Sequence, residues 1–110
     1  MSNNSAGHRR GPPSLWIQRF ADTMESGGNV LDLACGSGRH SIFLLARGHN
    51  VTACDINLSG VTDLRETAGL ELVEADLENA PWPFAGRHFA AIIVTNYLHR
   101  PLFPHILTAL

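Results

Sequence analysis

The sequence lacks several features that mark whole classes of protein. Its 110 residues include only two cysteines and no CxxC pair, so no disulfide framework is indicated. No apolar run reaches the roughly 18 residues that a membrane-spanning helix needs. The polar start MSNNSAGHRRGPPS has no apolar core of a secretory signal. We therefore expect a cytoplasmic protein with reduced thiols and no membrane partner.

Charge is also scarce. Charged residues make up 16% of the chain, the net charge is −2, and neither half carries a basic block. This argues against nucleic acid as the main partner. The 45% hydrophobic content supports a packed core of one small domain. We expect a flexible tail over residues 1–12 and a single domain over residues 13–110.

Short apolar segments alternate with segments of helical pattern. We expect helices at residues 14–24, 39–46, 59–68 and from 101 onward, and strands at 30–34, 51–54, 70–75 and 89–94. Strands separated by helices of about ten residues imply right-handed crossovers and a parallel sheet covered on both faces. The predicted fold class is α/β, an open Rossmann-like parallel sheet of about four strands.

The stretch VLDLACGSGR, residues 30–39, ends the first strand and begins the next helix. Its glycines allow a sharp turn and let a ligand approach the backbone closely. The helix start that follows favours an anionic group. A tight turn without any ligand explains the same residues, so the turn alone leaves both interpretations open.

An acid ends each of the next two strands. Asp55 follows the second strand, where a carboxylate can accept hydrogen bonds from both hydroxyls of a ribose. Asp76 ends the third strand and suits an exocyclic amine, with the backbone N–H of Leu77 available to a ring nitrogen. Each acid alone could equally cap a helix or face solvent. Together with the glycine turn, the two acids favour a bound nucleoside.

Two classes of nucleotide cofactor compete for this pattern. The dinucleotide fingerprint G-x-G-x-x-G needs a third glycine, and Ser41 stands at that position when counted from Gly36. Asp32, just before the turn, would repel a pyrophosphate but suits a cationic ligand. An NAD(P)-dependent Rossmann oxidoreductase is therefore the alternative to a cationic nucleoside cofactor.

Four segments together resemble the class I S-adenosylmethionine-dependent methyltransferases: VLDLACGSGRHS, VTACDIN, LVEADLENAPWPF and FAAIIVTNYLHRPLF. They are most similar to small bacterial, tellurite-resistance-like members, and the resemblance covers residues 13–110. It implies S-adenosyl-L-methionine as the cofactor and a small-molecule methyl acceptor. Ala34 stands where many members have glycine, although alanine is also common there.

The resemblance assigns cofactor contacts at the ends of all four strands. The acid of the first strand would orient the ammonium group, and the turn would lie against the methionine part. The second and third strand ends would hold the ribose and the adenine, and the fourth would line the cofactor and substrate face. In chain order these residues are Asp32, Ala34, Gly36, Ser37, Gly38, Asp55, Ile56, Asp76, Leu77, Asn96 and Tyr97.

Other residue patterns give weaker evidence of function. Asn96-Tyr97 resembles the motif of DNA amino-methyltransferases, but the Pro-Pro that separates the two residue types is absent, as is a basic patch. The six histidines show no compact metal-ligand spacing, so no metal is predicted. His99 suits a general base or an ordinary surface position. We assign no catalytic residue, because positioning alone can drive methyl transfer from an activated sulfonium.

The resemblance implies a seven-stranded fold, of which this chain would hold only the four-strand, cofactor-binding half. The fourth strand would then expose an unpaired apolar edge. We expect two copies to associate through this edge, or by exchanging the last helix, as a homodimer. Because the missing half usually contributes to the acceptor site, a catalytically inactive cofactor-binding or self-associating remnant is a further alternative.

Overall fold

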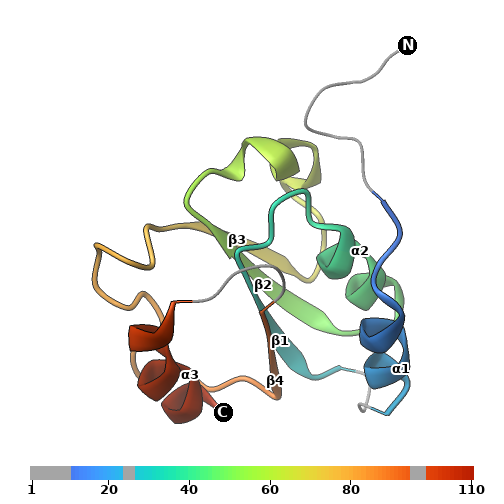
Figure 1. Cartoon of the computed structure of the whole chain (residues 1–110). Helices are drawn as coiled ribbons and strands as arrows, with labels where there is room; N and C mark the ends of the chain where they lie inside the picture. Colours follow the sequence, from blue (N-terminus) through green and yellow to red (C-terminus); the bar gives the residue numbers. More distant parts are fainter. Residues whose placement is uncertain (1–10, 24–26, 95–98) are drawn as a thin grey trace.

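The computed structural model describes residues 11–23, 27–94 and 99–110 (Figure 1). The predicted alternation of strands and helices is confirmed, and the predicted tail falls almost wholly outside the described residues. The elements are, in chain order, α1 (Leu15–Thr23), β1 (Asn29–Leu33), α2 (Arg39–Ala46), β2 (Asn50–Asp55), the 3-10 segment η1 (Leu58–Leu64), β3 (Leu70–Glu74), β4 (Ala91–Val94), the 3-10 segment η2 (Arg100–Leu102) and α3 (Phe103–Ala109).

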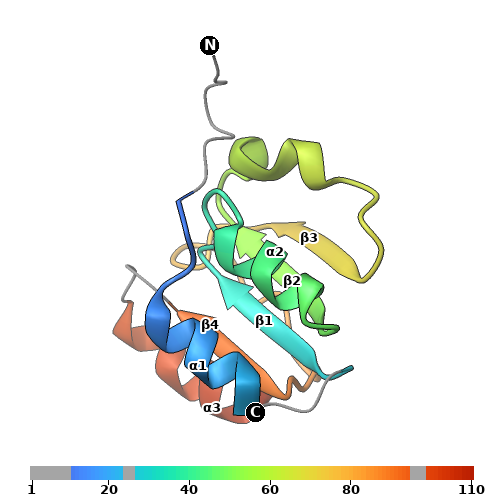
Figure 2. The same cartoon turned by 90° about the vertical axis from the view of Figure 1, so that its right-hand side faces the viewer.

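The four strands form one parallel sheet in the order β3-β2-β1-β4. Asp32 of β1 lies opposite Ala53 of β2 and Ile93 of β4, so the carboxyl ends of the strands meet at one edge. Figure 2 shows α1 and α2 in front of this sheet and α3 behind it. The predicted parallel α/β sheet with helices on both faces is thereby confirmed.

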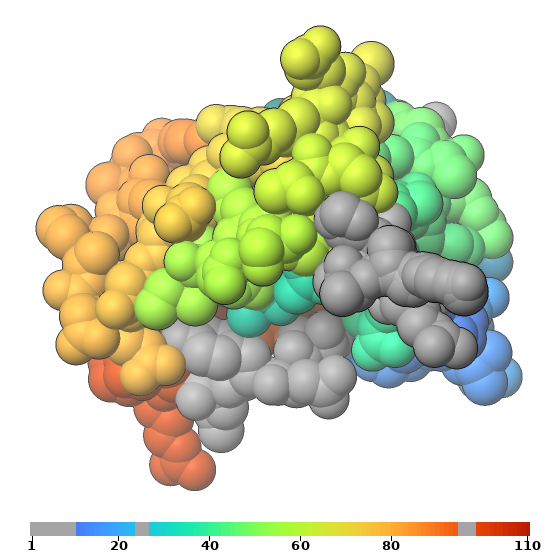
Figure 3. Space-filling model, turned by 90° about the horizontal axis from the view of Figure 1, so that it is seen from above, coloured from blue at the N-terminus to red at the C-terminus, as the bar shows by residue number. Residues whose placement is uncertain are grey.

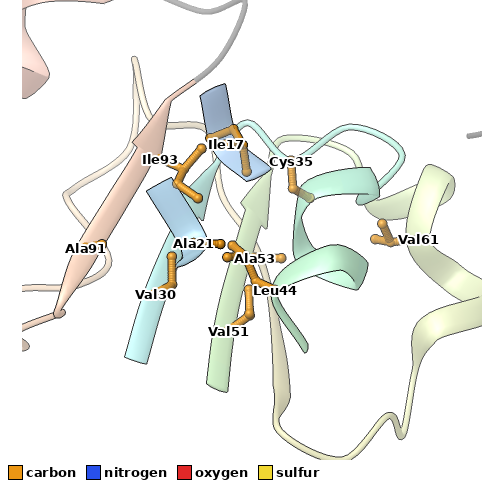
Figure 4. Close-up of a cluster of buried hydrophobic side chains, with 10 residues drawn as sticks. All are labelled: Ile17, Ala21, Val30, Cys35, Leu44, Val51, Ala53, Val61, Ala91 and Ile93. Atoms are coloured by element: carbon orange, nitrogen blue, oxygen red, sulfur yellow. The ribbon is translucent and has the colours of Figure 1, made fainter. Parts of the chain in front are cut away.

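Two apolar clusters hold the three layers together. Successive side chains of a strand point to opposite faces, so Val30 joins one cluster and Leu31 the other. The first cluster fills the space between the sheet and the helices α1 and α2 (Figure 4) and contains Ile17, Ala21, Val30, Cys35, Leu44, Val51, Ala53, Val61, Ala91 and Ile93. The second contains Leu31, Leu33, Cys54, Leu77, Phe84, Phe89, Leu102 and Ala109.

The long loop between β3 and β4 covers the second face of the sheet with aromatic side chains. Phe84 is fully buried and meets Phe89 edge to face, with 5.7 Å between ring centroids. Trp82 stacks on His105 of α3 at 5.4 Å. Arg87 donates to the carboxylate of Glu71 at 2.9 Å, and this hydrogen bond lowers the pKa of Glu71. The loop therefore closes the core instead of lying free.

The helix predicted over residues 59–68 is wrong in type and length. The chain forms 3-10 turns over Leu58–Leu64, interrupted at Val61, whose φ of −130° is not helical. Asn57 caps this segment, because its side-chain oxygen accepts from the backbone N–H of Ser59 at 2.9 Å. Burial of Val61 in the first cluster outweighs the weak helical preference of this glycine- and β-branched-containing segment.

The last strand begins two residues later than predicted. The N–H of Phe89 donates to the carbonyl of Ala109 in α3 at 2.7 Å, and β4 begins only at Ala91. The apolar run FAAIIV gives no sign of this change of partner, because both residues before Ala91 fit a strand pattern. The bond fixes the end of α3 to the start of β4.

Candidate functional site

The chain leaves β1 through a turn with left-handed backbone. The φ angles are positive at Ala34 (56°), Gly36 (56°) and Gly38 (80°). Gly38 immediately precedes α2, and a Cβ there would come within 2.8 Å of the side chain of Val61. Glycine at position 38 is thus required both by the backbone conformation and by packing against η1.

Asp55, at the end of β2, ties the glycine turn to the next turn. One oxygen of its carboxylate accepts from the N–H of Gly36 at 2.8 Å, and the other accepts from the N–H of Asn57 at 3.2 Å. The side chain is only half-buried. Because an ionised carboxylate offers about four acceptor positions, it can still receive hydrogen bonds from a ligand.

A hollow of about 140 Å³ opens at the carboxyl ends of the strands. Figure 3 looks onto this edge of the sheet, where the chain following β1 (teal) lies beside the chain following β2 (green). The lining combines three carboxylates with apolar walls, among them the exposed side chain of Ile56. It consists of Ala34, Asp55, Ile56, Ala75, Asp76, Leu77 and Glu78.

The hollow gathers five of the predicted cofactor contacts: Ala34, Asp55, Ile56, Asp76 and Leu77. The turn residues 36–38 lie beside it, joined to it through the bond to Asp55. Asn96 and Tyr97 lie outside the described residues. Sequence reasoning missed the contributions of Ala75 and Glu78, although their position next to the acid that ends the third strand was a signal for both.

Asp76 has the capping role that the sequence left open. One carboxylate oxygen accepts from the backbone N–H groups of Glu78 at 3.0 Å and Asn79 at 3.2 Å, and the other accepts from the Asn79 side chain at 3.0 Å. The bond from the Asn79 side chain is the main cause of a lowered pKa of Asp76. The second oxygen retains a lone pair that a ligand amine can use.

Asp32 lies beneath the turn and is not part of the lining of the hollow. Its side chain is 1% exposed, and the hydroxyl of Ser41 donates to it at 2.7 Å. Burial raises the pKa of Asp32 to about 6, with a smaller contribution from the charge of Asp55, while Ser41 and Arg39 act in the opposite direction. Its negative charge is therefore held behind the turn, and contact with an ammonium group stays a prediction.

Two histidines lie near this edge. Nε2 of His40 accepts from the backbone N–H of Ser14 at 3.2 Å, joining the start of α1 to α2, and burial lowers the pKa of His40. A neutral ring suits that acceptor role. Nδ1 of His99 lies 3.8 Å from a carboxylate oxygen of Glu78, at the rim of the hollow. Within the described ranges, no three His, Cys, Asp or Glu side chains cluster closely enough to hold a metal ion.

The two cysteines are free and buried. Burial raises the pKa of Cys35 to about 12 and that of Cys54 to about 11. Both side chains therefore stay as thiols at neutral pH and pack as apolar groups, so neither is suited to act as a nucleophile.

A second hollow, of about 210 Å³, lies between the β3–β4 loop and α3. It is lined mainly by Trp82, Phe84, Arg87, His88, His105 and Thr108. Arg87 is already engaged with Glu71 and lies over the Phe89 ring. Since none of the predicted contacts reaches this hollow, the candidate site is the one at the carboxyl ends of the strands.

The left-handed backbone at Ala34 predicts a stabilising substitution. An L-residue in this conformation costs about 1–2 kcal/mol relative to glycine, part of which is offset by the greater freedom of glycine in the unfolded chain. We expect Ala34→Gly to raise the free energy of unfolding by about 0.5–1 kcal/mol in urea denaturation. Ala46→Gly in α2 is the matched control and should lower it; a lower stability in both variants would contradict the role of the positive φ.

Gly60 of η1 is a further residue that sequence reasoning missed. A Cβ at this position would lie 2.8 Å from the carbonyl oxygen of Gly36, which belongs to rigid backbone. We expect Gly60→Ala to displace the glycine turn and to lower the free energy of unfolding by about 1–3 kcal/mol. Ser59→Ala, at the exposed neighbouring position, should leave stability within about 0.5 kcal/mol. Equal stability of the two variants would show that the close approach does not matter.

Comparison with known proteins places this geometry in a family. The sequence model of a protein family described as the methyltransferase domain matches residues 30–110. The glycopeptide N-methyltransferase MtfA in complex with S-adenosyl-L-methionine is 27% identical over 70% of this chain and 34% of its own, with a TM-score of 0.54. No curated protein matches the sequence.

Two further solved structures share the fold. A TehB-like S-adenosylmethionine-dependent methyltransferase from Corynebacterium glutamicum has a TM-score of 0.58 and 21% identity over 82% of this chain and 44% of its own. Coclaurine N-methyltransferase bound to N-methylheliamine and S-adenosylhomocysteine has a TM-score of 0.57 and 20% identity over 70% and 24%. The chain thus spans less than half the length of these three proteins. Because the family match extends over most of its residues, the chain belongs to the methyltransferase domain family.

Proposed function

We propose that this chain is the cofactor-binding part of an S-adenosylmethionine-dependent methyltransferase that acts on a small-molecule acceptor. The observation that carries the proposal is the hollow at the strand ends, where Asp55 and Asp76 stand beside the apolar side chains of Ile56 and Leu77. The relatives solved with S-adenosylmethionine or S-adenosylhomocysteine support this choice of cofactor.

The residues of the hollow fit the adenosine part of this cofactor. Asp55 has acceptor capacity left for ribose hydroxyls, and Asp76 has it for an amine. Ile56 and Leu77 offer apolar surface to a flat ring, and no described residue accepts a hydrogen bond from the Leu77 N–H. Acceptors and apolar walls are thus both present where a nucleoside requires them.

The surroundings of the turn favour a cationic amino acid over a pyrophosphate. The position of the third dinucleotide glycine is occupied by Ser41, which is fully buried and holds the carboxylate of Asp32. A negative charge fixed behind the turn attracts an ammonium or sulfonium group and repels a diphosphate. The start of α2 remains suited to the carboxylate of the methionine part. This arrangement argues against the NAD(P)-dependent alternative.

When bound, S-adenosylmethionine supplies an activated methyl group. The residues of this chain would bind and orient it, and the rate would then depend on how an acceptor is positioned. Of the two histidines near the site, His99 lies at the rim beside Glu78 and His40 is used to join two helices. We assign no catalytic residue, and the inactive, cofactor-binding remnant remains the alternative.

The cell compartment and the subtype are part of the same proposal. None of the described helices has the length and apolar character needed to cross a bilayer. We propose a cytoplasmic location and a small-molecule acceptor. The net charge of −2 and the lack of a basic block argue against a nucleic acid as the acceptor. The similarity to a TehB-like methyltransferase extends to the fold alone, and a relation to the tellurite-resistance-like members is part of our proposal.

Calorimetric titration of the chain with S-adenosylmethionine, S-adenosylhomocysteine and NAD tests the proposal. We expect both adenosyl ligands to bind with similar stoichiometry and NAD to give no signal. Binding of NAD alone would support the oxidoreductase alternative. Binding of none of the three would favour a self-associating remnant.

A further inference from the structure

The segment of residues 11–14, which leads into α1, passes beside the start of α2 (Figure 2). Nη1 of Arg39 donates to the carbonyl oxygen of Pro12 at 3.1 Å, and the N–H of Ser14 donates to Nε2 of His40 at 3.2 Å. Arg39 and His40 are the first two residues of α2. Residues 11–14, which we call the strap, are thus held by the helix end that follows the glycine turn.

The closed strap also contains a group that opposes closure. The hydroxyl oxygen of Ser14 is buried and has no hydrogen-bond partner within the described ranges. Burying a hydroxyl without a partner is costly, because it gives up its bonds to water. The side chain of Gln18 donates to the Pro13 carbonyl at 3.0 Å, but this bond joins the strap to α1 and not to α2. Closure against α2 therefore depends strongly on Arg39 and His40.

The bond from Ser14 depends on the protonation state of His40. Nε2 can accept only from a neutral ring that carries its proton on Nδ1, because both nitrogens of a protonated ring are donors. The side chain of His40 is 3% exposed, and burial together with the charge of Arg39 lowers its pKa. Release of the strap would return the ring toward water, and its pKa toward the ordinary 6.5.

The charged groups on the surrounding elements favour a neutral ring as well. The strap, residues 11–14, carries no charged side chain. On α2, Arg39 repels a protonated ring. On α1, Arg19 is a further cation, and Asp22 pairs with the far end of α2. Asp32 of β1 has a pKa raised to about 6, so it loses its charge in acid. Protonation would thus place a second cation beside Arg39 with little compensation.

Acid should therefore favour the released strap. Between the lowered pKa of His40 and 6.5, the released state binds a proton that the closed state excludes. The closed strap consequently loses stability as the pH falls through this window. At neutral pH the ring is uncharged in both states, and the bond to Ser14 contributes fully.

We propose that His40 is a positioning residue of the cofactor site, which holds the strap on the first turn of α2 while its ring is neutral and releases it on protonation. The inference rests on the proposed function, because the start of α2 is the place suited to the methionine carboxylate. A strap that is bonded to the first two residues of α2 restrains this turn before the ligand arrives. Its release should therefore weaken binding.

NMR spectroscopy of the ligand-free chain tests the strap without the cofactor. We expect the neutral ring of His40 to carry its proton on Nδ1. The protection factor of the Ser14 N–H should fall at least about threefold between about pH 7.5 and pH 5.5. His40→Gln keeps an oxygen acceptor that does not titrate, so this fall should be absent. The matched control His49→Gln replaces another histidine that is 3% exposed, beyond the other end of α2, and should keep the fall.

Titration with S-adenosylhomocysteine tests the consequence for the site. Because Asp32 titrates over part of the same range, the informative quantity is the ratio of dissociation constants between variants at one pH. At about pH 5.5, His40→Gln should bind at least about threefold more tightly than the wild type. At about pH 7.5 the two should bind equally. His49→Gln should follow the wild type at both values.

Three results would overturn the role of His40: a ring proton on Nε2, Ser14 protection that does not change with pH, or a change that persists in His40→Gln. Equal affinities of wild type and His40→Gln at both pH values would also overturn it, because the strap would then not act on the site. If His40→Gln fails to fold, the tautomer and the pH series of the wild type still decide. Absence of S-adenosylhomocysteine binding in every variant would instead contradict the proposed function, and the ligand-free spectra would decide the role of His40 in holding the strap.

Discussion

Asp32→Asn is expected to raise the free energy of unfolding at neutral pH by about 1–3 kcal/mol. Burial raises the pKa of Asp32 from 3.8 to about 6, so at neutral pH the folded chain holds a carboxylate that water would solvate better. Asparagine removes the charge and keeps an oxygen that can accept from Ser41. The gain is limited by how well the amide group fits the remaining space.

The pH dependence of stability follows from the same shift. Between about pH 4 and pH 6 the folded state retains a proton on Asp32 that the unfolded state has released, so the contribution of Asp32 to stability falls as the pH rises. Chemical denaturation between about pH 4 and pH 6 should show this fall in stability in the wild type, and the fall should be absent in Asp32→Asn. Ser41→Ala is the control, because it removes the hydrogen bond while leaving the charge. Equal stability of wild type and Asp32→Asn at neutral pH would contradict the account.

The same substitution should weaken binding of S-adenosylmethionine. If the carboxylate behind the turn attracts the cationic end of the cofactor, wild-type affinity should rise as Asp32 ionises around pH 6. In Asp32→Asn the affinity should be lower at neutral pH, and this part of its pH dependence should be absent. A more stable variant with undiminished affinity would show that Asp32 has no part in cofactor binding.

Asp55→Ala is expected to weaken binding of S-adenosylmethionine by about 1–3 kcal/mol, or roughly 5–150-fold. The carboxylate is the acceptor best placed for ribose hydroxyls, and it also holds the N–H groups of Gly36 and Asn57. Its loss should therefore lower stability as well, by about 1 kcal/mol for each backbone hydrogen bond. Calorimetric titration, together with urea denaturation of the same variant, measures both effects.

A ligand without ribose hydroxyls separates direct contact from support of the turn. If Asp55 holds the ribose, the wild type should lose affinity for the deoxygenated analogue, and Asp55→Ala should show little further preference between the two ligands. If Asp55 only supports the turn, the substitution should weaken both ligands by the same factor. That second result, or unchanged affinity in a folded variant, would remove Asp55 from direct contact with the cofactor.

Much of this fold follows from local sequence patterns. The bounds of α2 agree with the prediction over residues 39–46, because an apolar helical pattern there lies between the glycines at 38 and 48. The segment around Gly60 could not be predicted, because its 3-10 form depends on Val61 reaching a core formed by distant residues. The late start of β4 likewise depends on a bond to α3, far along the chain.

The candidate site, too, could be predicted from the sequence only in part. The end of a parallel strand predicts where a side chain lies, and this placed Asp55, Asp76 and Leu77 around one hollow. It does not predict side-chain partners, so neither the burial of Asp32 against Ser41 nor the approach of Gly60 to the turn was accessible from sequence.

The most direct test of the proposed site is a crystal structure of the chain with S-adenosylhomocysteine. The account predicts the adenosine in the hollow at the strand ends, the ribose hydroxyls on Asp55 and the adenine beside Leu77. The ligand in the hollow lined by Trp82 and His105 instead, or adenosine at the strand ends with no contact to Asp55, would contradict it.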